Sequence, residues 1–300
     1  MIYSKGSLLI THSRVAGHVL NRLREPSYGD ILVPGGTVSI FGTTSLRVES
    51  LDMIRPTVEE TDILVKEASA MAPELERARY IRAYAGVRPL IRNSGGGSGD
   101  DRSVSRGFSL MDHGAEGVEN FVTITGGKMT TFRLMAEKTA NLIADKLCLK
   151  TKCLTAATPL KSKAPSRMTE AGMAFRFRSG RDQTEDITLC ECEMISRNQF
   201  KELITWLKET RKTSDLNALR VHSRLGKGAC QGTFCSQRVT GFMYDEDYLK
   251  NDEGLYNIKD LLRERFTGQR PVLWDGQLAQ DELNEALFCG FYGLDLEKPL

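Results

Sequence analysis

Hydrophobic and polar positions follow two different periods in the first half of the chain. β-Branched and aromatic runs predict three strands, at 37–41, 79–87 and 121–125. Apolar residues recur at helical spacing over 58–71, where Pro73 follows, and again from Thr131. The second helix is expected to bury one face, formed by Phe132, Met135, Ala136, Thr139, Ala140, Ile143 and Leu147. This mixture predicts an α/β fold with a mixed, largely antiparallel sheet over residues 1–150.

The second half of the chain changes character. Residues 151–185 contain prolines and basic residues without a clear period, which is typical of a linker. Residues 186–245 form a small helical unit, in which Ser196 and Gln199 make a capping-box pattern. The helix that follows carries one apolar face, Phe200, Leu203, Ile204 and Leu207, and Asp215 is expected to begin another helix. Residues 246–300 are interpreted as a helical C-terminal tail.

Composition and charge narrow the class of protein. The chain has 300 residues, of which 40% are hydrophobic and 27% charged, as in ordinary globular proteins. Its net charge of +2 does not favour a nucleic-acid partner. Its apolar runs are too short for a transmembrane segment or a secretory signal, so we expect a cytoplasmic protein.

Four of the seven cysteines form two close pairs. Cys190 and Cys192 are separated by one residue, and Cys230 and Cys235 follow after a gap of 37 residues. Two bridged irons need four thiolates that converge from two sides, and two loops joined by a helix supply them. Glycines around the second pair allow backbone N–H groups to approach the sulfurs. The spacing therefore favours a [2Fe–2S] cluster.

Two other interpretations of the four cysteines stay open. A structural zinc ion is one, although zinc pairs more often have the spacing C-x2–4-C. Buried thiols without a metal are the other. Cys148, Cys153 and Cys289 stand apart and are interpreted as ordinary thiols.

A glycine–lysine turn follows the strand at 121–125. Gly126, Gly127, Lys128, Met129 and Thr130 lead into the helix that begins near Thr131. Such a turn directs N–H groups and the positive end of the helix dipole at an anionic or electron-rich group, and Lys128 adds a full charge. An ordinary strand–turn–helix connection with an exposed lysine is the alternative.

An arginine precedes a proline directly after the predicted strand at 79–87. Because Pro89 restricts the preceding residue to extended geometry, Arg88 has a stiffened backbone. Its guanidinium then suits a carboxylate or a phosphate, while a surface salt bridge is the alternative.

Together these blocks resemble a known family. Residues 5–10, 31–45, 83–91 and 123–147 are similar, in this order, to FAD-dependent glycerol-3-phosphate dehydrogenases. Residues 188–240 resemble the helical [2Fe–2S] domain first known from bacterioferritin-associated ferredoxin. Within the family, the likeness is greatest to the large catalytic subunit of the anaerobic enzyme.

The resemblance implies an activity and a set of partners. These are oxidation of sn-glycerol 3-phosphate to dihydroxyacetone phosphate by hydride transfer to FAD, and electron transfer through the [2Fe–2S] cluster. Flavin and iron–sulfur membrane-anchor subunits would receive the electrons for membrane quinone, which places the chain peripherally on the inner membrane. Residues 1–150 would face substrate and flavin, with Arg88 and Lys128 at the substrate phosphate or the flavin. By the same resemblance, Gly126, Gly127, Lys128, Met129 and Thr130 would approach the flavin ring.

One family feature is not found in the sequence. No G-x-G-x-x-G turn follows a strand, so we expect that the N-terminal FAD-binding portion is missing and that FAD binding needs it. No general base is identified, since His12 and His113 are interpreted as loop residues. Two alternatives remain: a non-catalytic [2Fe–2S] electron-transfer or interaction protein, and another FAD-dependent amine or hydroxy-acid oxidase.

Overall fold

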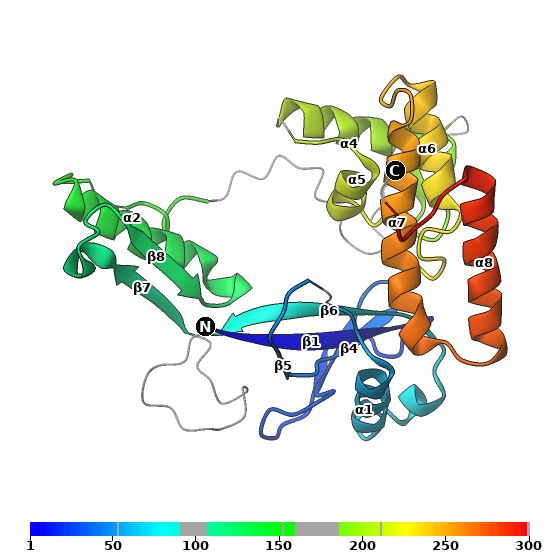
Figure 1. Ribbon diagram of the computed structural model, residues 1–300, viewed down its shortest axis with the longest axis horizontal. Helices are drawn as coiled ribbons and strands as arrows, with labels where there is room; N and C mark the ends of the chain where they lie inside the picture. The colour runs from blue at the N-terminus through cyan, green and yellow to red at the C-terminus, as the bar shows by residue number, and fades with distance from the viewer. Residues whose placement is uncertain (53, 91–106, 152, 160–185, 211, 299–300) are drawn as a thin grey trace. The chain divides into compact units, whose positions relative to one another are not determined.

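The chain folds into two compact units. The computed structural model describes residues 1–52, 54–90, 107–151, 153–159, 186–210 and 212–298 (Figure 1). The first unit comprises Met1–Gly6, Ser45–Ile54 and Ala85–Ser162, and the second comprises Ser7–Thr44, Arg55–Tyr84 and Lys163–Leu300. Strands β1 (Ile2–Thr11) and β6 (Tyr80–Leu90) contribute residues to both units.

The main sheet has the strand order β2-β3-β4-β1-β5, and β6 also pairs with β1. The short strands are β2 (Leu20–Asn21), β3 (Ile31–Pro34), β4 (Ser39–Gly42) and β5 (Leu46–Val48). In the second unit β1 runs antiparallel to β4, and Leu9 lies opposite Phe41. Both side chains are fully buried, so this register places the apolar side chains of β1 and β4 in one core. The predicted strands at 37–41 and 79–87 are confirmed, and the strand pairs β1–β4 and β1–β5 are antiparallel.

Helix α1 (Val58–Ser69) covers this core with Leu64 and Ala68. It begins with a capping box between Thr57 and Glu60. The Glu60 carboxylate is buried, and it accepts a hydrogen bond of 2.7 Å from the Thr44 hydroxyl. The prediction of a helix from Val58 is confirmed, but the helix ends at Ser69, and Pro73 begins the short 3-10 helix η1 (Pro73–Arg77).

The first unit contains an antiparallel hairpin and one long helix. The hairpin joins β7 (Phe108–Asp112) to β8 (Val122–Gly126), with η2 (His113–Glu116) between them. The 3-10 helix η3 (Met129–Thr131) then leads into α2 (Phe132–Lys146). The strand at 121–125 and the helix from Thr131 are confirmed.

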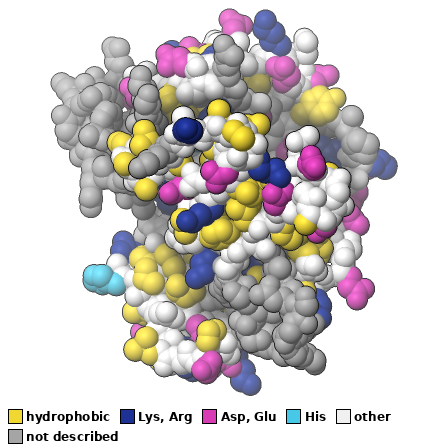
Figure 2. Space-filling view, turned by 90° about the vertical axis from the view of Figure 1, so that its left-hand side faces the viewer, with side chains coloured by type: hydrophobic (Ala, Val, Ile, Leu, Met, Phe, Trp, Pro, Cys, Tyr) yellow, Lys and Arg dark blue, Asp and Glu magenta, His cyan; other side chains and the backbone are white. Residues whose placement is uncertain are grey.

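The predicted apolar face of α2 is not buried. No residue of α2 is buried among the described residues, and Phe132 is 53% exposed. Figure 2 shows hydrophobic side chains lying at the surface among charged ones on the face that it draws. Helical spacing fixes the direction of an apolar face, but it does not fix what covers that face.

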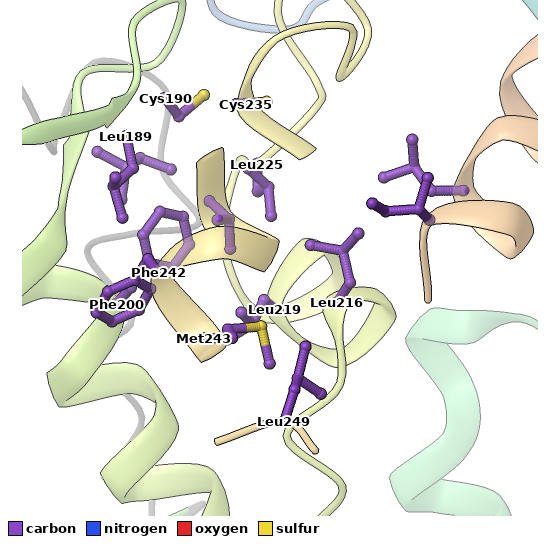
Figure 3. Close-up of a cluster of buried hydrophobic side chains, with 14 of the residues drawn as sticks. Leu189, Cys190, Phe200, Leu216, Leu219, Leu225, Cys235, Phe242, Met243 and Leu249 are labelled. Atoms are coloured by element: carbon purple, nitrogen blue, oxygen red, sulfur yellow. The ribbon is translucent and has the colours of Figure 1, made fainter. Parts of the chain in front are cut away.

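The helical part of the second unit has its own core. It contains β9 (Thr188–Cys190), β10 (Ile195–Ser196), α4 (Arg197–Glu209), α5 (Leu216–His222), α6 (Cys235–Asp245), α7 (Glu253–Gln269), η5 (Arg270–Val272) and α8 (Gly276–Tyr292). The predicted capping box at Ser196 and the predicted start of a helix at Asp215 are confirmed. All four apolar residues predicted for the face of α4 are completely buried. Figure 3 shows this core, with Cys190 and Cys235 at one edge.

The same core extends into the predicted C-terminal tail. Ile258, Leu261, Leu262 and Phe266 of α7 are buried together with Phe200 and Leu203 of α4. Residues 160–185 of the predicted linker lie outside the described residues, and the predicted domain boundaries stay predictions. In the described part of the chain, no helix combines the length and the apolarity needed to cross a membrane.

A charged network links β6 to two helices in the second unit. The Glu264 carboxylate accepts from Arg82 Nη2 and from Arg220 Nη1, each at 2.5 Å. Burial by itself would raise the pKa of Glu264, but the Arg220 hydrogen bond and the charges of Arg82 and Arg220 lower this pKa to about 2. The ionised carboxylate therefore stabilises the folded chain.

Replacing Glu264 with Gln should lower the free energy of unfolding at pH 7. We expect a loss of about 1 kcal/mol, because half of the Glu264 side chain is exposed and solvent screens the pair. A carboxyl group whose pKa is lower in the folded chain than in the unfolded chain stabilises the fold at any pH above its unfolded-state pKa. The difference in unfolding free energy between wild type and Glu264→Gln should therefore shrink as the pH falls from about 4.5 to about 2. Urea unfolding across this pH range, with the exposed Glu282→Gln as control, tests the prediction. A difference that does not change with pH would contradict it.

Candidate functional site

The four paired cysteines meet at the edge of the helical core. Cys190 ends β9 and Cys192 lies in the turn after it, whereas Cys230 lies in the loop before α6 and Cys235 is the first residue of α6. The Cys235 thiol hydrogen-bonds to the sulfurs of both Cys190 and Cys230, and the Cys192 thiol hydrogen-bonds to Cys230. Figure 3 shows the Cys190 sulfur directed toward Cys235. Segments separated by 37 residues thus contribute to a single thiol cluster.

Shared protons divide the four sulfurs into two classes. The hydrogen bond from Cys235 lowers the pKa of Cys190 and lowers that of Cys230 to about 5. Donating its proton to both partners raises the pKa of Cys235, and burial raises the pKa of Cys192 to about 11. Cys190 and Cys230 are therefore the two cysteines of the cluster with lowered pKa, and the thiolate is the form that binds metals.

Backbone N–H groups point at the sulfurs. Cys190 accepts from the N–H groups of Glu193 and Gly226, Cys230 accepts from those of Gly232 and Phe234, and Cys192 accepts from that of Cys230 itself. Hydrogen bonds of this kind stabilise negative charge on sulfur.

Glycines are needed for this geometry. Gly226 and Gly232 have φ values of 70° and 90°, in the left-handed region that favours glycine. A Cβ atom at Gly228 would lie 2.5 Å from Cβ of Cys192, so only glycine fits there. The expectation that glycines let the loop backbone approach the sulfurs is consistent with these contacts.

A buried ion pair joins the two cysteine segments. Arg224 Nε donates to the Glu193 carboxylate at 2.6 Å, and the Glu193 side chain is 3% exposed. Glu193 follows the first cysteine pair, and Arg224 precedes the second. Removing one partner of such a pair leaves an uncompensated buried charge, so the ion pair favours keeping the segments together.

The charged side chains around the thiols could not be identified from the sequence. Glu193, Arg224 and Arg265 have no pattern that separates them from surface charges, because their partners are distant in sequence. The position of Glu193 directly after C-x-C is the one signal that was available.

A cavity lies next to the thiol cluster, within the second unit. It has a volume of about 790 Å³, and Cys230, Thr233 and Arg265 are among its lining residues. His12 and Trp274 also line it. One of the four sulfur-bearing residues is therefore accessible from a space of small-molecule size.

The glycine–lysine turn has the predicted local form. Gly126 and Gly127 have φ values of 81° and 78°, and the Gly127 N–H donates to the Gly107 carbonyl. A Cβ atom at Gly127 would lie 2.4 Å from the Met135 sulfur, and the φ value of 78° strains any other residue there, so the turn favours glycine. Lys128, Met129 and Thr130 follow and are all exposed.

Arg88 and the two histidines lie outside the thiol cluster. The Arg88 guanidinium packs over Gly6 of β1, where a Cβ atom would approach within 2.4 Å of it. His113 lies in η2, and its ring nitrogens hydrogen-bond to Glu116 and Thr123. His12 is exposed at the end of β1. Of the remaining cysteines, Cys289 lies in α8, and Cys148 and Cys153 belong to the first unit.

The thiol cluster does not have the form of a single-ion site. In the part of the chain that the structure describes, no group of three or more His, Cys, Asp or Glu side chains is arranged to hold a metal ion. The four thiols instead form a chain of three pairwise hydrogen bonds: Cys192 to Cys230, Cys230 to Cys235, and Cys235 to Cys190.

Comparisons with known proteins place this geometry in context. No protein-family model matches the chain. The chain is 36% identical to the A subunit of the anaerobic glycerol-3-phosphate dehydrogenase of Escherichia coli (strain K12), over 99% of this chain. It is 34% identical to the subunit of the same name from Haemophilus influenzae, over 100% of this chain and 56% of that protein.

One solved structure is similar in fold. The glycerol-3-phosphate dehydrogenase from Bacillus halodurans, complexed with FAD, matches 91% of this chain with a TM-score of 0.53 and 20% identity. The mixed α/β fold with antiparallel sheets therefore resembles that of an FAD-dependent oxidoreductase. The chain spans 58% of the length of that structure and 58% of the Escherichia coli protein, which it resembles along almost all of its own sequence.

Proposed function

We propose that this chain is part of an FAD-dependent sn-glycerol-3-phosphate dehydrogenase of the anaerobic type and carries a [2Fe–2S] electron relay. The observation that carries the proposal is the meeting of four thiols in a chain 36% identical to a subunit of an anaerobic glycerol-3-phosphate dehydrogenase. The reaction is oxidation of glycerol 3-phosphate to dihydroxyacetone phosphate.

The donor set supports a two-iron cluster. Four cysteines are the usual ligands of [2Fe–2S], and thiols that interact in pairs suit two adjacent irons better than one zinc ion. The N–H groups of Glu193, Gly226, Gly232 and Phe234 would offset the negative charge that iron and sulfide leave on the sulfurs. Cys190, Cys192, Cys230 and Cys235 would hold the cluster, which would accept and release one electron at a time.

The turn at Gly126 supports the flavin side of the proposal. Two consecutive left-handed glycines precede η3 and α2, so the positive end of the α2 dipole lies on the side of the turn. FAD, when bound, supplies the hydride acceptor. Gly126, Gly127, Met129 and Thr130 would approach its ring, and Lys128 would stabilise negative charge there.

Arg88 is the second proposed substrate residue. It lies on β6 before Pro89, with its guanidinium over Gly6, in the same unit as Lys128. A guanidinium held in this way suits the phosphate of glycerol 3-phosphate, which needs paired N–H donors.

The proposal extends to partner subunits. The relatives are named as one subunit of an anaerobic enzyme, which supports further subunits for this chain. An iron–sulfur membrane-anchor subunit, together with a flavin subunit, would take electrons from the [2Fe–2S] cluster toward quinone. The chain would be peripheral to the inner membrane through these partners.

Replacing Cys192 with Ser should reduce the iron content of the anaerobically purified chain at least twofold. The half-buried Cys192 would be a ligand, and a serine hydroxyl is a much weaker ligand for iron than a thiolate. Iron and acid-labile sulfide per chain are the measurements. Cys289→Ser, at a half-buried cysteine outside the thiol cluster, should leave both unchanged. Equal iron in wild type and Cys192→Ser would contradict the proposed ligand set.

The flavin side can be tested with a supplemented chain. Co-expression with the portion of the Escherichia coli protein that this chain does not align with should restore flavin retention and glycerol-3-phosphate-dependent dye reduction. In that complex, Lys128→Ala should lower kcat/KM at least tenfold, because a full charge at the turn is lost. Lys138→Ala, at an exposed lysine of α2, is the matched control. Failure of the wild-type complex to retain flavin, or equal effects of the two substitutions, would contradict the proposal.

A further inference from the structure

A buried arginine anchors the loop that carries Cys230 and Cys235. Arg265 lies on α7 and is 7% exposed. Its Nη1 donates to the Cys230 carbonyl at 3.1 Å and to the Thr233 hydroxyl, and its Nε donates to the Gln269 side chain at 3.0 Å. Arg265 thus fixes two residues of the cysteine loop from a helix that begins 18 residues after Cys235.

The charge of Arg265 also acts on the sulfurs. Its guanidinium interacts electrostatically with Cys230 and Cys235, and the other charges that act on it are Asp281 and Arg82. Burial reduces the screening of these interactions by solvent and salt. Arg82 reaches the same loop more weakly, through a 3.4 Å hydrogen bond to Gln231.

Three other arginines near the thiol cluster have carboxylate partners. Arg224 is paired with Glu193, Arg238 with Glu191, and Arg220 with Glu264. Arg265 differs because no carboxylate of the described residues lies within ion-pair distance of it, and its hydrogen bonds go to neutral groups. The buried Asp281 offsets part of its positive charge from beyond ion-pair distance, and that charge also acts on Cys230 and Cys235.

We propose that Arg265 is a positioning residue that holds the cysteine loop and raises the reduction potential of the cluster bound there. This inference rests on the proposed [2Fe–2S] site. Reduction adds one negative charge to the cluster, and a buried positive charge stabilises the reduced form more than the oxidised form. Removing that charge should lower the reduction potential.

The test is a dye-mediated redox titration of the anaerobically purified chain, followed by the EPR signal of the reduced cluster. At a fixed potential near the wild-type midpoint, Arg265→Gln should decrease the ratio of reduced to oxidised cluster about tenfold, equivalent to about 59 mV for one electron. Arg265→Lys keeps the charge and should recover most of the wild-type ratio. Arg263→Gln removes an exposed charge from the same helix and should leave the ratio within twofold of wild type.

A second variant keeps the test decisive if Arg265→Gln does not fold. Gln269→Glu retains Arg265 and its bonds to the loop but places a carboxylate on its Nε, so it should lower the ratio in the same direction. An unchanged ratio in a cluster-bearing Arg265→Gln or Gln269→Glu protein would overturn the inference, as would an Arg265→Lys ratio as low as that of Arg265→Gln. Absence of any cluster in the wild-type chain would instead overturn the proposed function, so the two failures are distinguishable.

Discussion

The geometry of the candidate site depends on holding two short cysteine segments, far apart in sequence, against one another. Thiolates repel when they are all ionised, and burial makes ionisation costly. In this chain the Cys235 thiol hydrogen-bonds to Cys190 and Cys230, and backbone N–H groups point at the sulfurs. Both interactions reduce the repulsion and the cost of burial. The buried pair of Glu193 and Arg224 adds an electrostatic link between the segments.

The helical core holds the contacts between the four cysteines in a fixed position. Helix α4 occupies part of the gap between the two cysteine segments and buries its apolar face beside α6 and α7. Cys190 and Cys235 are themselves members of that core, so the thiol cluster is continuous with packed leucine and phenylalanine side chains (Figure 3). A shift of α6 or α7 would therefore disturb the sulfurs directly.

Local sequence patterns were sufficient for some features of the structure. The capping box at Ser196, the helix start at Asp215 and the strand ending at Gly126 depend on residues within a few positions of one another. The close spacing within each cysteine pair is also a local signal, whereas the meeting of the two pairs depends on how the intervening 37 residues fold. The exposure of α2 was not predictable from the sequence. Its exposed residues, such as Phe132, follow the same period as the buried residues of α4. Arg265 and Arg224 were missed because their roles depend on contacts 31 to 35 residues distant in sequence.

The residues proposed to face the flavin lie in a different part of the molecule from the thiols. The glycine–lysine turn and Arg88 belong to the first unit, whereas the thiols belong to the second. Under the proposed function, the first unit would hold the hydride acceptor and the second unit would hold the one-electron carrier.

The most direct measurement is the metal and sulfide content of the wild-type chain after anaerobic purification, together with its visible and EPR spectra. We predict about two irons and two sulfides per chain, broad iron–sulfur absorption, and an EPR signal that develops on reduction. Zinc bound in place of iron, or a chain with neither metal nor sulfide, would contradict the electron-relay function of the four cysteines.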